Sequence, residues 1–537
     1  MKKVIALIFI CYTFNFVTFA DTGFFFYVQF ADKNNTPFSL EEPLEYLSPR
    51  AIERRMFFGI AIDSTDLPVN PEYVSNVKNA GVKIVGKSRW LNGVTILAQD
   101  SNIMQNIRNL PFVTKTQYTG HRTSQQYVSK ISKTIRTTND SLKYGSSEPQ
   151  IKQIKADALH NLGYRAKGIQ MAVIDGGFFN ANINPAFDSL RFHNRLLGTK
   201  DFTDSNISVY DSHQHGANVL SIMAGNLPNQ YIGIAPEASF WLLQSEYNAS
   251  EYLVETDFWI SAIEFADSAG VDMATSSLGY RTFEDPSMNF TYNDMNGQVS
   301  RASIVAEMAA HKGLVVCVSA GNDGSGVWHY IASPADARGI VTVGSVTKDG
   351  NPSPFSSYGP SADGRVKPEL VAMGSNTAYV STSGTPTAGN GTSYSTPVMA
   401  GALACFLQYA KENFTNFSVE QLLSAVFESG NTYLSPQPQT GYGIPNFELA
   451  MSNLNNMIDD IPKTSYKKRV FYNSESQTLH IDKDMTDNEN ITLYSVLGKA
   501  IFNKKNTTEN ISLKQYNLSP NVYILRIGNT AQKLIVY

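Results

Sequence analysis

Cysteine is scarce in this chain, with three residues among 537. Cys11 lies in the first twenty residues, while Cys317 and Cys405 sit in apolar runs, where a free thiol packs as a small hydrophobic side chain. A scaffold built on disulfides is therefore excluded, and core burial must stabilise the fold. The apolar setting of both thiols also argues against a cysteine nucleophile.

Charge is sparse as well. Asp, Glu, Lys and Arg make up 17% of the chain, and the formal net charge is −4, so there is no basic excess to attract nucleic acid. Hydrophobic residues reach 42%, which over this length predicts three or four globular domains. Beyond the N-terminal region no apolar run is long enough for a transmembrane segment.

The N-terminus has the pattern of a secretory signal peptide. Lys2 and Lys3 precede a mostly apolar run from Val4 to Phe19, and Ala20 ends it before Asp21. We predict that residues 1–20 are removed on export. A membrane anchor is the alternative, although the run is shorter than the ~20 residues that span a bilayer.

Four segments follow. Residues 21–120 mix strand and helix patterns and predict a small α+β domain, and residues 121–147 are polar and predict an exposed linker that can be cut. Residues 148–452 alternate apolar strands with helices, which predicts an α/β fold with a doubly wound parallel sheet. Residues 466–537 predict a small β domain.

The expected strands of the parallel sheet span Gln170–Asp175, Ser239–Gln244, Val271–Ser276, Leu314–Ser319 and Ile340–Val346. Active sites of such sheets lie at the carboxyl ends of the strands. In the last segment a period of two pairs Leu479 with Ile481, Ile491 with Leu493, and Val522 with Ile524.

The segment Gly391-Thr392-Ser393-Tyr394-Ser395-Thr396-Pro397 places a serine at the start of a helix rich in small residues. There Ser393 would have a backbone N–H without an intrahelical acceptor, and the positive helix end would stabilise developing negative charge. A helix cap is the simpler interpretation of a Gly-Thr-Ser string. The complete segment favours a nucleophile.

A serine nucleophile needs a base, and two segments upstream can supply it and its partner. His215 opens a helix and Asp175 ends an apolar strand, so the chain order is Asp, His, Ser, one of the known orders of a catalytic triad. His213 and Asp211 lie close by, and with His215 they could bind a metal instead. No further ligands accompany them.

The oxyanion of an acyl-transfer reaction needs a second donor. The segment Ser319-Ala320-Gly321-Asn322 offers the Asn322 side-chain amide just after a buried strand. An asparagine in a turn is the alternative interpretation.

These segments together resemble the subtilisin (subtilase) family of serine proteases over residues 148–452. The resemblance implies Asp175, His215 and Ser393 as the triad and Asn322 as oxyanion donor. It also implies a substrate pocket with two walls, made of Ser277, Leu278 and Gly279, and of Ser319, Ala320 and Gly321. Tyr280 stands where a second glycine is common in the family, so we expect it to crowd the cleft.

No cofactor is required for this chemistry. Structural calcium is a family habit, and Asn293-Asp294-Met295-Asn296-Gly297 could bind it or simply form a turn.

The flanking segments carry two further resemblances. Residues 21–120 resemble the family's propeptide, which implies autocleavage within about residues 121–148; a permanent N-terminal binding domain is the alternative. Residues 466–537 resemble the C-terminal sorting domain of the type IX secretion system of Bacteroidetes, through Tyr494-Ser495-Val496-Leu497-Gly498-Lys499 and Leu518 to Leu525.

We therefore expect a self-matured serine endopeptidase that cleaves protein or peptide substrates through an acyl-enzyme. It would be a monomer, exported through periplasm and outer membrane by the type IX machinery and secreted or held at the cell surface. A catalytically silent surface-binding protein on the same scaffold is the rival, and an esterase is a third interpretation.

Overall fold

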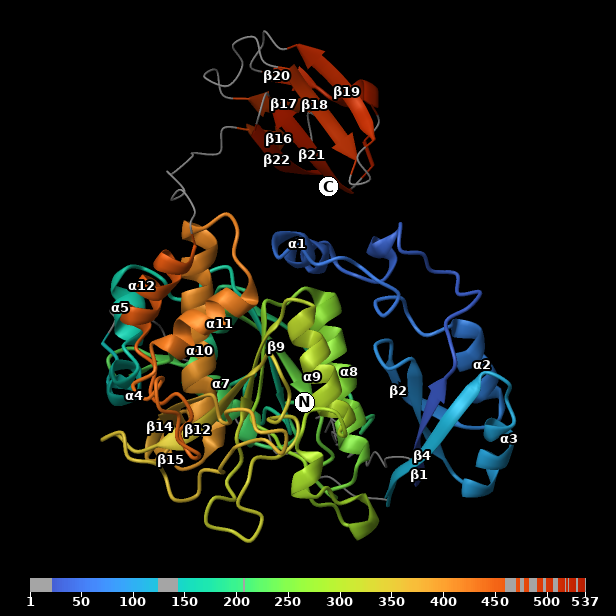
Figure 1. Cartoon of the computed structure of the whole chain (residues 1–537), viewed down its shortest axis with the longest axis vertical. Helices are drawn as coiled ribbons and strands as arrows, with labels where there is room; N and C mark the ends of the chain where they lie inside the picture. The colour runs from blue at the N-terminus through green and yellow to red at the C-terminus, as the bar shows by residue number, and fades with distance from the viewer. Residues whose placement is uncertain are drawn as a thin grey trace, which may run out of the picture. The chain divides into compact units, whose positions relative to one another are not determined.

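The computed structural model describes residues 22–123, 143–205 and 208–458. In the C-terminal region it describes segments 470–473, 478–481, 490–495, 499–505, 510–516, 518–519, 521–527 and 530–536. The predicted signal peptide and most of the predicted linker, with its maturation site, lie outside the described residues. The chain divides into two compact units between residues 460 and 461 (Figure 1).

A seven-stranded parallel sheet forms the centre of the first unit, in the order β13-β12-β11-β10-β5-β9-β6. Its strands are β5 (Gln170–Asp175), β6 (Leu196–Asp201), β9 (Ser239–Gln244), β10 (Met273–Ser276), β11 (Val315–Ser319), β12 (Val341–Val346) and β13 (Leu370–Met373). The predicted α/β fold is confirmed. Strands β6 and β13 were not predicted: β6 is half-exposed and lacks a continuous apolar run, and β13 has only four residues.

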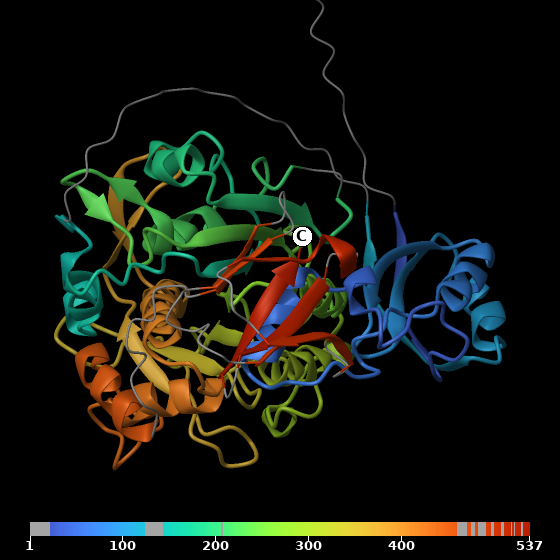
Figure 2. The ribbon, with the colours of Figure 1, turned by 90° about the horizontal axis from the view of Figure 1, so that it is seen from above.

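Helices cover both faces of this sheet (Figures 1 and 2). The principal ones are α5 (Ala156–Asn161), α7 (His215–Ala224), α8 (Val254–Ala269), α9 (Arg301–His311), α10 (Thr392–Asn413), α11 (Val419–Glu428) and α12 (Phe447–Met457). No helix within the described ranges combines the length and apolar character needed to cross a bilayer.

Strand β5 shows why both faces are covered. Met171 and Val173 belong to the core with α7 and α10, whereas Ala172 and Ile174 belong to the core with α8 and α9. Successive side chains of a strand point to opposite faces, so an uninterrupted apolar strand requires burial on both sides. Cys317 and Cys405 are fully buried free thiols, as predicted.

The N-terminal part is a four-stranded antiparallel sheet in the order β2-β3-β1-β4. In chain order, the elements of the N-terminal part are β1 (Gly23–Phe30), α1 (Pro49–Phe57), α2 (Pro71–Asn79), β2 (Lys83–Ser88), β3 (Gly93–Ala98), α3 (Met104–Arg108) and β4 (Val113–Arg122). Phe25 of this sheet packs edge-on against Phe258 of α8, with ring centroids 5.9 Å apart. The two parts therefore share a hydrophobic core.

Buried charges also join the two parts. The carboxylate of Asp267 on α8 is fully buried and accepts hydrogen bonds from three arginines of the N-terminal part, Arg54, Arg55 and Arg89. Lys312 forms an ion pair with Asp66 at 2.9 Å. Loss of one partner from a buried pair costs ~3–5 kcal/mol, so this network holds the parts together.

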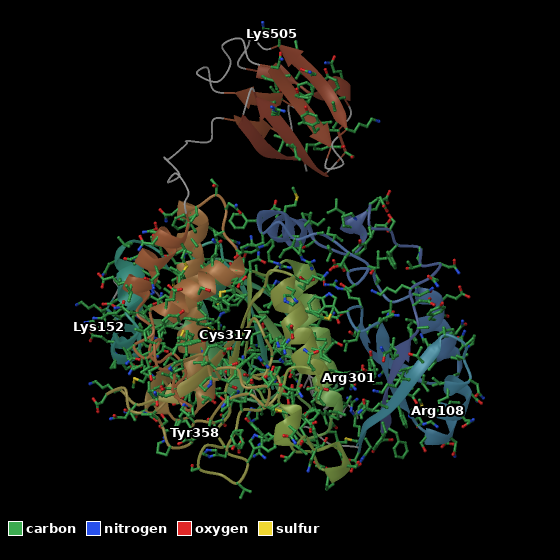
Figure 3. All side chains as sticks on the ribbon, viewed as in Figure 1. Arg108, Lys152, Arg301, Cys317, Tyr358 and Lys505 are labelled. Atoms are coloured by element: carbon green, nitrogen blue, oxygen red, sulfur yellow. The ribbon has the colours of Figure 1, made fainter. Side chains whose placement is uncertain are left out.

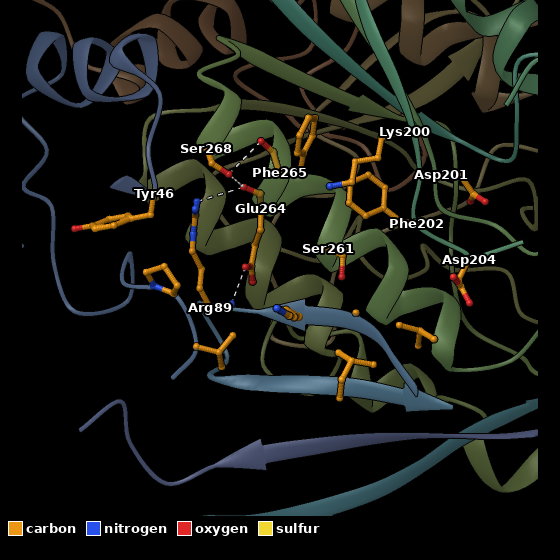
Figure 4. Close-up of a pocket in the computed structure, with 16 residues that line it drawn as sticks. Tyr46, Arg89, Lys200, Asp201, Phe202, Asp204, Ser261, Glu264, Phe265 and Ser268 are labelled. Carbon is orange, nitrogen blue, oxygen red and sulfur yellow. Dashed lines mark hydrogen bonds between the residues drawn. The ribbon is translucent and has the colours of Figure 1, made fainter. Parts of the chain in front are cut away.

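Two views show the junction in detail. In Figure 3, Arg301 of α9 lies at the boundary, where its guanidinium sits 4.5 Å from the centre of the Tyr27 ring. Figure 4 shows residues of both parts that line a cavity here, with Arg89 next to Glu264. The volume of this cavity is about 450 Å³. There the Arg89 backbone N–H donates to Glu264 Oε2 at 2.8 Å.

The second unit consists of two small antiparallel sheets. Its strands are β16 (Val470–Asn473), β17 (Thr478–Ile481), β18 (Asn490–Ser495), β19 (Ala500–Lys505), β20 (Asn510–Ser512), β21 (Asn521–Ile527) and β22 (Thr530–Val536). Leu479, Ile491 and Leu493 are buried as predicted, but in β21 the core residues are Tyr523 and Leu525, and Ile524 is half-buried.

Candidate active site

Three of the predicted residues lie at element ends in the first unit. Asp175 is the last residue of β5, His215 is the first residue of α7, and Ser393 is the second residue of α10. Asp175 ends its strand at the carboxyl edge of the sheet, where the helices that follow the strands also begin. Parallel β topology thus places a carboxylate and two helix starts at one edge.

Asp175 and His215 are in direct contact. His215 Nδ1 lies 2.8 Å from Asp175 Oδ1 and 3.0 Å from Oδ2, and the aspartate side chain is fully buried. Burial by itself would lower the pKa of His215, but the charge and hydrogen bond of Asp175 outweigh it and raise the pKa. The Asp175 carboxylate therefore orients the ring and favours the imidazolium.

Ser393 lies in the first turn of α10 after Gly391, whose φ of +149° disfavours a side chain. Its hydroxyl donates to the carbonyl of Ser277 at 3.4 Å, and the Ser277 hydroxyl donates back to the Ser393 carbonyl at 3.1 Å. Ser277 lines the same pocket as Asp175 and His215. Among the described hydrogen bonds, none joins Ser393 to His215.

Asn322 follows β11 and contacts the start of α10. Its Oδ1 accepts from the Thr392 backbone N–H at 2.8 Å and from the Thr392 hydroxyl at 3.0 Å. Both bonds use the amide oxygen, so the Nδ2 group remains available as a donor. Asn322 thus contacts Thr392, the residue directly before Ser393.

The two predicted pocket walls are neighbouring segments. Strands β10 and β11 pair in parallel, with Ser276 opposite Val318, so Ser277, Leu278 and Gly279 leave the sheet beside Ser319, Ala320 and Gly321. The Ser319 hydroxyl donates to the Leu278 carbonyl at 3.4 Å. The Ala320 side chain is fully buried in the core and contributes backbone only.

Gly321 shows a requirement for glycine. Its φ is +105°, and a Cβ there would lie 2.9 Å from the Ser357 hydroxyl. A larger residue would therefore strain the backbone next to Asn322.

The pocket around Asp175 and His215 has a volume of about 550 Å³. Its lining also contains Glu246, Glu251 and Glu255, which the sequence reasoning missed. Two signals were available: these residues follow β9, whose carboxyl end neighbours Asp175, and Glu251 and Glu255 are four residues apart. Burial first, and then like charge, raises the pKa of Glu246 to about 8 and of Glu251 to about 7.

Tyr280 does not crowd the cleft as predicted. Its side chain is buried at 1% exposure, and its hydroxyl donates to Glu246 Oε1 at 2.6 Å. It therefore supports the wall from behind.

His213 and residues of the 293–297 segment, the alternative metal ligands, form hydrogen bonds with close neighbours in the chain. His213 Nδ1 accepts from the His215 backbone N–H at 3.2 Å. In the 293–297 segment, the Asp294 carboxylate bonds Thr291, and Asn296 Oδ1 accepts from the Gln298 N–H. Those oxygens are committed to a turn.

Comparison with known proteins identifies two regions. Residues 25–138 match the peptidase S8 propeptide domain of Bacteroidota, and residues 166–443 match the subtilase family. Subtilisin NAT of Bacillus subtilis subsp. natto is 31% identical over 313 residues, 57% of this chain and 72% of that protein.

Two other proteins are similar. Subtilisin of Bacillus pumilus is 30% identical over 56% of this chain and 97% of its own length. The structure of the prenylagaramide maturation protease PagA has 21% identity and a TM-score of 0.44, covering 56% of this chain and 98% of that one. With its propeptide match and its match over residues 166–443, the chain belongs to the subtilase family of serine endopeptidases.

Proposed function

We propose that Ser393, His215 and Asp175 form a catalytic triad for peptide-bond hydrolysis. The observation that carries this proposal is the contact between the His215 Nδ1 and the buried Asp175 carboxylate, with a helix-start serine held at the same pocket. The bond to Asp175 fixes Nδ1 as the protonated nitrogen, so Nε2 is free to act as a base.

The chemistry runs in two halves. Ser393 Oγ forms a bond to the substrate carbonyl carbon while its proton moves to His215 Nε2, and the carbonyl oxygen becomes an oxyanion. The C–N bond then breaks, His215 gives its proton to the leaving amine, and an acyl-enzyme remains. Water repeats both steps and releases the acid.

Asn322 Nδ2 and the Ser393 backbone N–H would hold the oxyanion. Ser277 to Gly279 and Ser319 to Gly321 would contact the substrate on either side of the scissile bond. This assignment rests on the proximity of Asn322 to the α10 start and on the pairing of β10 with β11.

Labelling with a fluorophosphonate probe tests the proposal against a catalytically silent binding protein. We expect one labelled site in the native protein, mapped by mass spectrometry to the peptide containing Ser393, and loss of labelling on heating. A native, folded preparation that takes up no probe would show that the scaffold is silent. Parallel ester and peptide assays distinguish an esterase.

Replacing Asn322 is expected to lower kcat by about 10²–10³ with little change in KM; this magnitude for an oxyanion donor was measured in subtilisin. Two variants distinguish the proposed role of Asn322 Nδ2 as a donor from the structural role of Asn322 Oδ1 as an acceptor for Thr392. Asn322→Asp keeps an oxygen acceptor for Thr392 but cannot donate, whereas Asn322→Ala loses both functions. Unchanged kcat in the aspartate variant would exclude Asn322 as the donor.

We also propose that the N-terminal part acts as an inhibitory propeptide until the chain cleaves itself. Its last described residues reach the pocket wall: His121 Nε2 lies 3.2 Å from the Tyr252 hydroxyl, and the Tyr247 hydroxyl donates to the Thr123 carbonyl at 3.4 Å. The following residues, 124–142, contain the predicted maturation site and lie outside the described residues.

Asp267→Asn is expected to weaken retention of the cleaved propeptide by about 10²–10³-fold, since three arginines lose their shared carboxylate and a broken buried pair costs ~3–5 kcal/mol. Size-exclusion chromatography of the matured protein at successive dilutions measures this. Glu237→Gln, at a surface pair with Arg165, is the matched control. Equal retention by both variants would contradict the role of Asp267.

For the termini, we propose export with removal of residues 1–20, and sorting by the type IX machinery through the second unit. The motifs of residues 494–499 and 518–525 support this route. Mass spectrometry of the secreted form would define both ends and the maturation bond.

A further inference from the structure

Three glutamates lie close together in the lining of the pocket that also contains His215 and Ser277. One carboxylate oxygen from each of Glu246, Glu251 and Glu255 lies within 4.8 Å of the others. The charged groups that act on these side chains are mainly other carboxylates, including Glu284 and Asp175. Three carboxyl groups thus share a small volume, and no lysine or arginine is paired with them in the described part of the chain.

Glu255 provides an independent observation. Its side chain is buried at 2% exposure, and one oxygen accepts from the Tyr247 backbone N–H at 2.9 Å, yet its Oε2 has no hydrogen-bond partner. A buried carboxylate oxygen without a partner is costly, because it loses its hydration and gains nothing in return. A bound cation would compensate the lost hydration of this oxygen.

The spacing fits a metal ion. Ca²⁺ binds oxygen ligands at about 2.3–2.6 Å, so ligands on opposite sides of the ion are about 4.6–5.2 Å apart, and closer when they are adjacent. We propose that Glu246, Glu251 and Glu255 bind a divalent cation of the calcium class. Glu251 is exposed and opens the site to water, which can complete the six to eight ligands of such an ion.

A substrate ammonium group is the other candidate occupant. A divalent ion is favoured on two grounds. A divalent ion neutralises two carboxylate charges, whereas an ammonium group neutralises one. A small ion can also reach the buried Glu255 oxygen, whereas an ammonium group would have to bring the rest of its side chain into the site. This site is separate from the 293–297 segment and uses no residue of the triad.

Such an ion would fix one side of the pocket. Residues 245–253 connect β9 to α8, and Glu255 lies in the first turn of α8. Glu246, Glu251 and Glu255 line the pocket with His215, and the connection contacts the end of the N-terminal part through Tyr247 and Tyr252. An ion bound by Glu246, Glu251 and Glu255 together would hold this part of the chain in one conformation whether or not the propeptide is present.

Binding is tested on the full chain carrying Ser393→Ala, which prevents self-digestion. After chelation and desalting, isothermal titration with Ca²⁺ measures the number of ions bound. Tb³⁺ serves as a second probe, because the Tyr280 hydroxyl bonds Glu246 and tyrosine can sensitise lanthanide emission. Glu251→Gln tests the site with minimal risk to folding, since this side chain is exposed, and Glu255→Gln tests the buried ligand. Glu420→Gln, an exposed residue of α11, is the matched control.

We expect Glu251→Gln to bind Ca²⁺ at least about tenfold more weakly at one site and to lose most tyrosine-sensitised emission. Ca²⁺ should raise the Tm of the parent and of Glu420→Gln, but not of Glu251→Gln. The proposal is overturned if the parent binds no ion, or if Glu251→Gln binds as many ions as tightly as the parent. In otherwise native protein, a selective loss of kcat/KM for lysine-containing over norleucine-containing peptides, with unchanged ion binding, would assign the glutamates to a substrate ammonium instead.

Discussion

Replacing Ser393 by alanine is expected to lower kcat by about 10⁶, the loss measured when the nucleophile is removed from subtilisin. The physical reason is that Ser393 would be the nucleophile of the proposed triad: it lies in the first turn of α10, follows the residue that bonds Asn322, and exchanges hydrogen bonds with Ser277, which lines the pocket with His215. Residual turnover would come from binding and the oxyanion donors alone. Peptide hydrolysis at saturating substrate measures it.

The same variant should keep its propeptide, because self-cleavage needs the nucleophile. Ser395→Ala is the matched control: this serine lies two positions further along α10, and its buried hydroxyl donates to the Thr392 carbonyl at 3.0 Å. We expect the control to mature and to cleave peptides. Maturation of Ser393→Ala in a protease-free preparation would rule out self-processing at this site.

The second large effect is expected for Asp175→Asn. Loss of the carboxylate removes both the orienting hydrogen bond and the charge that stabilises the imidazolium, and the corresponding change in a serine-protease triad costs about 10⁴ in kcat. Titration of His215 should change as well. Asp175 raises the pKa of His215, so its removal lowers that pKa.

The sign of the pH effect follows. Catalysis needs the neutral imidazole, so activity rises as pH increases through the His215 pKa. In Asp175→Asn the acidic limb of the kcat/KM profile should therefore move to lower pH, on top of the lower rate. Asp211→Asn, an exposed acid in the loop before α7, is the control and should leave the limb in place. A limb that stays fixed in Asp175→Asn would mean that His215 is not the titrating base.

Much of the first unit was predictable because its signals are local. The apolar runs Gln170–Asp175 and Ser239–Gln244 match β5 and β9 residue for residue, and the residues of the proposed triad could be chosen from short segments. A buried parallel strand needs an apolar run whatever surrounds it, and a helix start needs particular neighbours.

What could not be predicted depends on pairs far apart in the chain. Arg55 and Asp267 are separated by 212 positions, and nothing in either local segment names the other. Tyr280 was expected to crowd the cleft because it stands where the family often has a glycine, but its hydroxyl donates to Glu246, which follows β9, and its side chain is buried. Side-chain direction at such positions is set by tertiary packing, which sequence pattern does not contain.

The arginine-lined carboxylate on α8 has a consequence after maturation. If the propeptide leaves as proposed, Asp267 would become exposed to solvent, and the departed fragment would carry the three arginines that bond it. Recapture of that fragment is a long-range electrostatic encounter, which dissolved ions slow by screening. In the proposed maturation, a rise in ionic strength would therefore slow re-inhibition of the cleaved protein.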